Sequence, residues 1–178
     1  MAEGHSYRRS LVRLRALVRD ALLGAVLVFC KELLAFLPNV EMVSMLIIAY
    51  TVVYRWRALV PIYVFVVLEA VIYPFPPTVA MYLYVWAILF LVVLLLPRKV
   101  LPAPVYMLIG GLFGLAFGTL CAPVQAAFFH LSAQGTLAWI AAGFSFDITH
   151  AVGNVAICCL TPVVIRLLLR MERHSFSN

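Results

Sequence analysis

The sequence predicts an all-α integral membrane protein with six transmembrane helices, cytoplasmic termini and a long outer loop between the fifth and sixth helices. Of its 178 residues, 66% are hydrophobic and 11% are charged, and the mean hydropathy is +1.09. A water-soluble domain of this size cannot bury so much apolar surface. Apolar runs long enough to cross a bilayer alternate with short polar breaks. Twelve of the thirteen Lys and Arg residues fall in four groups that fit one face of a membrane.

The apolar runs define the predicted helices in order. They cover residues 16–37, 40–54, 58–73, 78–96, 103–122 and 146–169, which form one bundle (16–169) in a single membrane domain (1–178). Residues 1–15 are then a basic cytoplasmic N-terminus and residues 170–178 a cytoplasmic tail. Turn signals separate the runs at residues 38–39, 55–57, 74–77 and 97–104. We expect Pro162 to kink the last helix.

The four basic groups orient the bundle. They are Arg8, Arg9, Arg13, Arg15 and Arg19; Arg55 and Arg57; Arg98 and Lys99; and Arg166, Arg170 and Arg173. Positive residues near helix ends stay on the cytoplasmic side, so we expect a multi-pass protein of the cell membrane with both termini inside. The net charge of +6 reflects this orientation and not nucleic-acid binding, because aromatic residues are not interleaved with the basic ones.

Residues 123–144 are the ambiguous segment. They are apolar enough for a seventh helix, but they include His130, Ser132 and Gln134. A seventh crossing would place the last arginine group outside. We therefore expect an outer loop that lies partly in the membrane interface, where Trp139 is favoured.

Small residues repeat along the fifth predicted helix. Gly110, Gly114 and Gly118 recur every four residues and form a stripe that lets another helix approach closely. Packing within this chain is the simpler reading. The four cysteines lack paired metal-ligand spacing and are expected to be small buried hydrophobes, so no metal site is predicted.

Polar residues gather in the outer half of the predicted bundle. They are Lys31, Glu32, Asn39, Glu41, Glu69, Asp147, His150 and Asn154, with the aromatic residues Tyr82 and Trp86 at similar depth. Ionisable groups at membrane depth are costly, so each is a functional candidate. Asp147, His150 and Asn154 are spaced three and four apart and share one helix face. Together these residues predict a pocket, open to the outside, in which a flat small molecule stacks on aromatic rings.

Structural roles compete with this reading for some residues. Glu41 is also placed to cap the second helix. Lys31 can neutralise Glu32 or Glu69. Enzymatic activity has little support, because the chain has no Gly-rich phosphate loop, H-E-x-x-H or G-x-S-x-G motif. An intramembrane enzyme using Asp147 and His150 stays a hypothesis without a nucleophile, so we predict no catalytic residues.

Three segments carry a resemblance to a known family. They are LPNVEMV at 37–43 with LIIAYT at 46–51, PIYVFVVLE at 61–69, and GFSFDITHAVGN at 143–154. In these segments the chain resembles the S components of energy-coupling factor (ECF) vitamin transporters. The resemblance implies a substrate-capturing subunit of about six helices whose pocket faces the outside. It also implies a coupling membrane subunit and two cytoplasmic ATPase subunits as partners, with ATP hydrolysed by those partners and no cofactor in this chain.

The resemblance further implies a partner surface and limits the substrate. Ala21, Gly24 and Ala25 match the family's small-residue pattern, which packs on the coupling subunit. Members specific for cobalt or nickel carry a histidine after the first methionine, whereas Ala2 stands here. Four acids against one base in the outer half favour a cationic or amine-bearing heterocycle. The alternative is a small proton-coupled secondary transporter or exporter that acts as a homo-oligomer through Glu69 or His150.

Overall fold

The computed structural model describes residues 2–37 and 40–176, and over these ranges the protein is helical with no strand. This confirms the predicted all-α class. The predicted site residue Asn39 lies outside the described residues. The helices are α1 (Ala2–Leu33), α2 (Val43–Tyr54), the 3₁₀ turn η1 (Arg55–Ala58), α3 (Leu59–Ile72), α4 (Pro76–Leu94), α5 (Ala103–Phe128), α6 (Ala133–Cys158) and α7 (Thr161–Phe176).

Three of the described helices are long and apolar enough to cross a membrane. These are α4 with 19 residues and α5 and α6 with 26 residues each. At 1.5 Å per residue, α5 and α6 each extend about 39 Å, which exceeds a hydrocarbon core of about 30 Å. The helices α2 and α3 have 12 and 14 residues and extend only about 18 and 21 Å. Membrane association is therefore supported by α4, α5 and α6, while the count of six crossings and the sides of the termini stay predictions.

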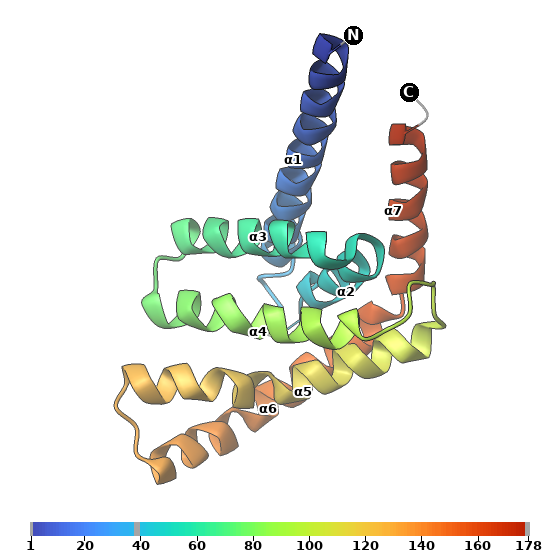
Figure 1. Cartoon of the computed structure of the whole chain (residues 1–178). Coiled ribbons are helices and arrows are strands. Elements are labelled where there is room, and N and C mark those ends of the chain that lie inside the picture. The colour runs from blue at the N-terminus through green and yellow to red at the C-terminus, as the bar shows by residue number, and fades with distance from the viewer. Residues whose placement is uncertain (1, 38–39, 177–178) are drawn as a thin grey trace.

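The helices α3, α4, α5 and α6 form a layer in which neighbours alternate in direction (Figure 1). Short connections suit this arrangement, since antiparallel neighbours need only a few residues between them. The helices α1 and α7 run across the layer and extend to the same side of it (Figure 1). α1 packs mainly on α3, and α7 packs on α2 and α5.

The short helix α2 lies at the centre of the molecule. Its residues from Val43 to Val52 are all buried, and it contacts α1, α4, α5, α6 and α7. The Tyr50 hydroxyl donates to the Leu23 carbonyl of α1 at 3.3 Å. A helix that is apolar all round belongs in the interior, so α2 is the element on which the others pack.

The expected outer loop at 123–144 is wrong. Residues 123–128 continue α5 and residues 133–144 begin α6, so only residues 129–132 connect the two helices. The Ser132 side chain caps α6 by accepting a hydrogen bond from the Gly135 amide at 3.1 Å. The polar residues that resemble a loop in sequence are a helix start, because serine is a favoured N-cap.

The boundaries of two other predicted segments also differ. The last helix, expected as one element over 146–169, is divided: α6 ends at Cys158 and α7 begins at Thr161. Pro162 lies at the second position of α7, where proline is tolerated, so a complete break between two helices replaces the kink that was expected. Residues 2–15, expected as a basic tail, belong to α1.

The glycine stripe of α5 brings α6 unusually close. A Cβ atom added at Gly110 would lie 2.5 Å from Cys158 Sγ, and one at Gly114 would lie 2.8 Å from the Ala151 backbone nitrogen. One added at Gly118 would lie 2.5 Å from an Asp147 carboxylate oxygen. The stripe therefore packs within the chain, as the simpler reading expected, and it fixes the position of the polar face of α6.

Candidate functional site

The polar face of α6 is the most buried part of the predicted site. Asp147, His150 and Asn154 are 5%, 4% and 1% exposed, and they point towards α5 and the start of α2. This confirms that they share one face. Their position along the helix differs from expectation, because α6 begins at Ala133 and places all three in its second half. The prediction that they lie near the first end of this helix is therefore wrong.

Asn154 joins three helices through its side-chain amide. Its Nδ2 donates to the Gly110 carbonyl of α5 at 3.1 Å and to the Ser44 hydroxyl of α2 at 3.3 Å. Its carbonyl oxygen, Oδ1, is buried without a hydrogen-bond partner. Buried polar atoms are normally paired, so the hydrogen-bonding capacity of Asn154 is not fully used by the described contacts.

Glu41 lies next to the imidazole of His150. Glu41 Oε1 is 3.2 Å from His150 Nε2 and accepts a hydrogen bond from the Ser44 hydroxyl at 3.1 Å. The N-cap of α2 is Met42, which makes no side-chain capping bond. Glu41 thus contacts α6 and a serine side chain, and the structure does not show it capping the backbone of α2.

Asp147 contacts the backbone of the neighbouring helix. Its Oδ1 accepts a hydrogen bond from the Gly118 amide at 2.9 Å. Among the described side chains, no lysine or arginine forms an ion pair with Asp147 or Glu41. Neither acid is therefore paired with a lysine or arginine among the described side chains.

An aromatic cluster adjoins these polar groups. Trp86 of α4 is fully buried and lies 5.4 Å from the Tyr82 ring and 5.8 Å from the Phe117 ring, between centroids. Phe117 lies 4.8 Å from the His150 ring. The indole nitrogen of Trp86 is buried without an acceptor. Phe117 therefore connects the aromatic and polar parts into one site, which holds an unused donor and an unused acceptor.

Lys31, Glu32 and Glu69 form a second cluster between α1 and α3. Lys31 Nζ lies 2.7 Å from Glu69 Oε2 and 3.1 Å from Glu32 Oε1. The Tyr73 hydroxyl donates to Glu32 Oε2 at 2.7 Å, and the Lys31 ammonium lies 4.5 Å from the centre of the Tyr73 ring. The expected pairing of Lys31 with an acid is confirmed, and it involves both. No hydrogen bond or ion pair between described side chains joins this cluster to the α6 face.

The small residues predicted to bind a partner are divided between two faces of α1. Ala21 and Ala25 are exposed, whereas Gly24 is buried. A Cβ atom at Gly24 would lie 2.5 Å from the side chain of Val64, so Gly24 serves the contact with α3. Beside it, α3 presents an open apolar depression lined by Leu59, Val60, Tyr63, Val64, Val67 and Leu68.

Two contact residues were missed by the sequence reasoning. Ser44 gives no signal in the sequence, because a single serine in an apolar run is common. Phe117 has a weak one, since Phe113 and Phe117 lie four apart beside the glycine stripe. Within the described residues, no group of three His, Cys, Asp or Glu side chains is arranged to hold a metal ion.

Comparison with known protein families, with curated proteins and with solved structures found no match.

Proposed function

We propose that this chain is the substrate-binding subunit of an ECF-type importer. It would capture a vitamin or related small heterocyclic micronutrient at the polar face of α6, for ATP-driven uptake by partner subunits. The observation that carries the proposal is the buried polar face of α6, joined through Phe117 to the aromatic cluster around Trp86.

Two polar atoms of the site are left for a ligand to satisfy. A buried amide or indole without a hydrogen bond costs roughly 1–3 kcal/mol. Asn154 Oδ1 and Trp86 Nε1 are buried without partners, as is Glu69 Oε1 in the second cluster. A heterocycle that offers a donor or an acceptor would satisfy one of the site's atoms and place its ring against aromatic side chains.

The charge of the site supports a cationic or amine-bearing substrate. Lys31 is engaged by Glu32 and Glu69, so its charge is neutralised within the second cluster. Glu41 and Asp147 pair with no lysine or arginine among the described side chains, and Glu41 lies 3.2 Å from the His150 imidazole. We therefore assign substrate binding to the α6 face with Glu41, Tyr82 and Trp86, and a structural role to Lys31, Glu32 and Glu69.

The orientation in the cell membrane follows from the basic groups. Arg55 in η1 donates to the carbonyl oxygens of Leu94 and Leu96, at 3.0 Å for Leu96. This contact brings the second basic group next to the third, which begins at Arg98. The clustering of two groups at one end of α4 supports the proposed cytoplasmic side.

The exposed face of α1 supports the proposed partner surface. Ala21 and Ala25 lie on it, and small residues allow close contact between membrane helices. We expect Ala21→Trp or Ala25→Trp to abolish co-purification with the coupling subunit and to leave substrate binding intact. Ala142→Trp, at an exposed alanine of α6, is the matched control. Unchanged assembly in both α1 variants would remove this surface.

The binding function itself is tested by identifying small molecules that co-purify with the chain. A high-affinity site should retain its ligand through detergent extraction, and mass spectrometry would detect it. Uptake that stops on ATP depletion supports the importer. Uptake that persists without ATP and collapses with an uncoupler would instead establish the proton-coupled transporter.

A further inference from the structure

The helix α7 presents two different faces away from the bundle. Its inner face is buried, with Thr161, Pro162, Ile165 and Leu168 packed inwards. α7 contacts α2 and α5. The remaining surface is therefore fixed in orientation by this packing, and its chemistry can be read from the exposed residues.

The first outer face is apolar. Leu160, which precedes the helix, and Val163, Leu167 and Met171 are all at least half exposed. Their spacing of three, four and four residues places them on one stripe of the helix. No described residue covers the stripe.

The second outer face carries three arginines. Arg166, Arg170 and Arg173 are exposed and are spaced four and three apart, which aligns them beside the apolar stripe. The one acid of α7, Glu172, is engaged elsewhere: Arg19 of α1 lies 3.3 Å from it. The arginines therefore keep their positive charge without a neighbouring acid from their own helix.

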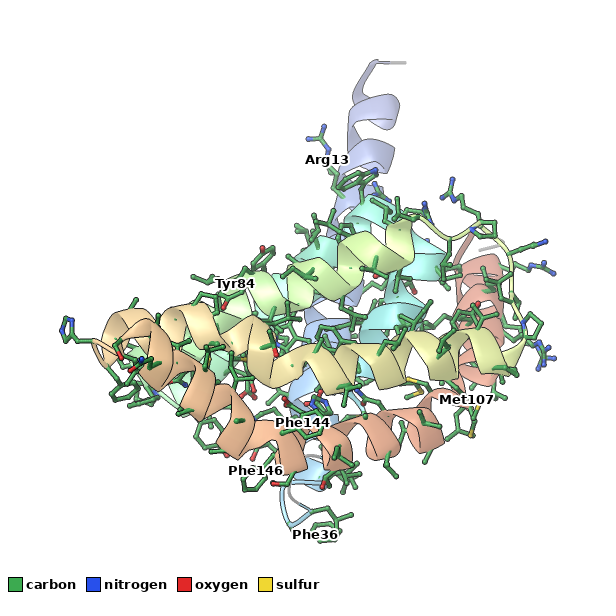
Figure 2. All side chains as sticks on the ribbon, turned by 90° about the horizontal axis from the view of Figure 1, so that it is seen from below. Arg13, Phe36, Tyr84, Met107, Phe144 and Phe146 are labelled. Carbon is green, nitrogen blue, oxygen red and sulfur yellow. The ribbon has the colours of Figure 1, made fainter. Side chains whose placement is uncertain are left out.

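The position of α7 matches the surface of a membrane. It follows α6, a helix long enough to span, after residues 159 and 160, and it runs steeply across α5 and α6 (Figure 1). Its first turn lies beside the connection between α4 and α5 (Figure 1), which carries Arg98 and Lys99. By contrast, Phe144 and Phe146 project from the outer surface of α6 itself (Figure 2), as expected of a lipid-facing span.

We propose that α7 is an interfacial helix that binds anionic phospholipid headgroups through Arg166, Arg170 and Arg173. Its apolar stripe enters the acyl-chain boundary, and the guanidinium groups hold lipid phosphates in bidentate hydrogen bonds. The adjoining apolar stripe favours a lipid surface over an acidic protein partner. A phospholipid offers its phosphate to the arginine face and its acyl chain to the apolar stripe at the same time. This inference is independent of what the buried site binds.

The test uses the purified full-length chain in neutral detergent with equimolar phosphatidylglycerol and phosphatidylcholine. Native mass spectrometry measures the ratio of the two lipids retained. We expect a preference for phosphatidylglycerol that falls about tenfold or more in the triple variant R166Q/R170Q/R173Q, since each arginine near an anionic surface contributes about a fivefold factor. Added salt should weaken the preference in the wild type.

The matched control removes the same charge at the same end of the molecule. R57Q/R98Q/K99Q changes three exposed basic residues that lie outside α7, and it should lose less of the preference than the α7 variant, because these residues are not aligned on one helix beside an apolar stripe. Equal losses in both triple variants, or a wild-type chain without preference, would overturn the proposal. A wild-type chain that retains both lipids equally, together with an α7 variant that no longer assembles with a protein partner, would show that the arginines bind a protein and would also overturn the proposal. Single variants, each expected to lose a few fold, replace the triple variant if it does not fold.

Discussion

The two polar clusters of this protein differ in how their charges are balanced. Between α1 and α3, Lys31 pairs with Glu69 and Glu32 and the Tyr73 hydroxyl donates to Glu32, while Glu69 Oε1 is buried without a hydrogen-bond partner. At the α6 face, no lysine or arginine pairs with Asp147 or Glu41 among the described side chains, Glu41 lies 3.2 Å from the His150 imidazole, and Asn154 and the adjoining Trp86 have unused hydrogen-bonding atoms. Charges that balance one another hold helices together, whereas acids without a lysine or arginine partner leave room for a cationic ligand.

The largest expected effect comes from breaking the second cluster, formed by Lys31, Glu32 and Glu69. Lys31→Met leaves Glu69, which is 4% exposed, without its cation, so we expect a loss of roughly 3 kcal/mol in the free energy of unfolding. Adding Glu69→Gln should recover part of that loss, because the uncompensated charge is then removed. Denaturant titration in detergent measures both. A single variant as stable as the wild type would show that this ion pair has no structural role.

Widening the contact between α5 and α6 comes next. Gly114→Val places side-chain atoms against the Ala151 backbone, which a Cβ alone would approach to 2.8 Å. We expect overpacking to cost about 1–3 kcal/mol and to displace the polar face of α6, which lowers ligand affinity as well. Gly143→Ala is the control, since nothing lies within 4 Å of its Cβ position. It should leave stability unchanged or slightly raised, and equal losses in the two variants would contradict this account.

Removing side chains from the polar face of α6 should lower ligand affinity more than it lowers stability. His150→Ala removes the ring between Glu41 and Phe117, and we expect about a tenfold loss of affinity for the co-purified ligand. Asp147→Ala should weaken binding in the same direction. Isothermal titration calorimetry measures affinity, and circular dichroism checks that helix content is retained. Affinity unaltered in both variants would remove the site from this face.

The smallest loss of stability is expected at Glu32, the most exposed acid of the second cluster. Glu32 is partly exposed and pairs with Lys31 at 3.1 Å, so Glu32→Gln should cost at most about 1 kcal/mol. Ligand affinity should not change. A tenfold loss of affinity in this variant would show that both clusters belong to one binding site, which contradicts the division of roles proposed here.

Local patterns in the sequence were sufficient for part of the site. The shared face of Asp147, His150 and Asn154 follows from helical periodicity alone, and so does the alignment of the three glycines of α5. The pairing of Lys31 was also predictable, because a lone lysine in an apolar run needs an acid. The two shared faces depend only on residues within a few turns of one another, whereas Lys31 also finds its acid on a second helix.

Other features were misjudged because one local signal fits two structures. Ser132 and Gly135 read as a loop, yet serine also begins helices, and here it caps α6. That single error moved the start of α6 by 13 residues relative to the predicted 146. The polar face consequently lies in the second half of the helix and not near its outer end.

The sequence by itself determined the helical class, the apolar character and which side chains share a face, because hydrophobic period and charge act over short stretches of chain. Only the tertiary structure decided that Glu41 meets His150, residues 109 positions apart, and that Phe117 links them to Trp86. Those contacts depend on how closely α5 and α6 approach and on α2 filling the centre. Such distances are set by packing among several helices, which no local pattern encodes.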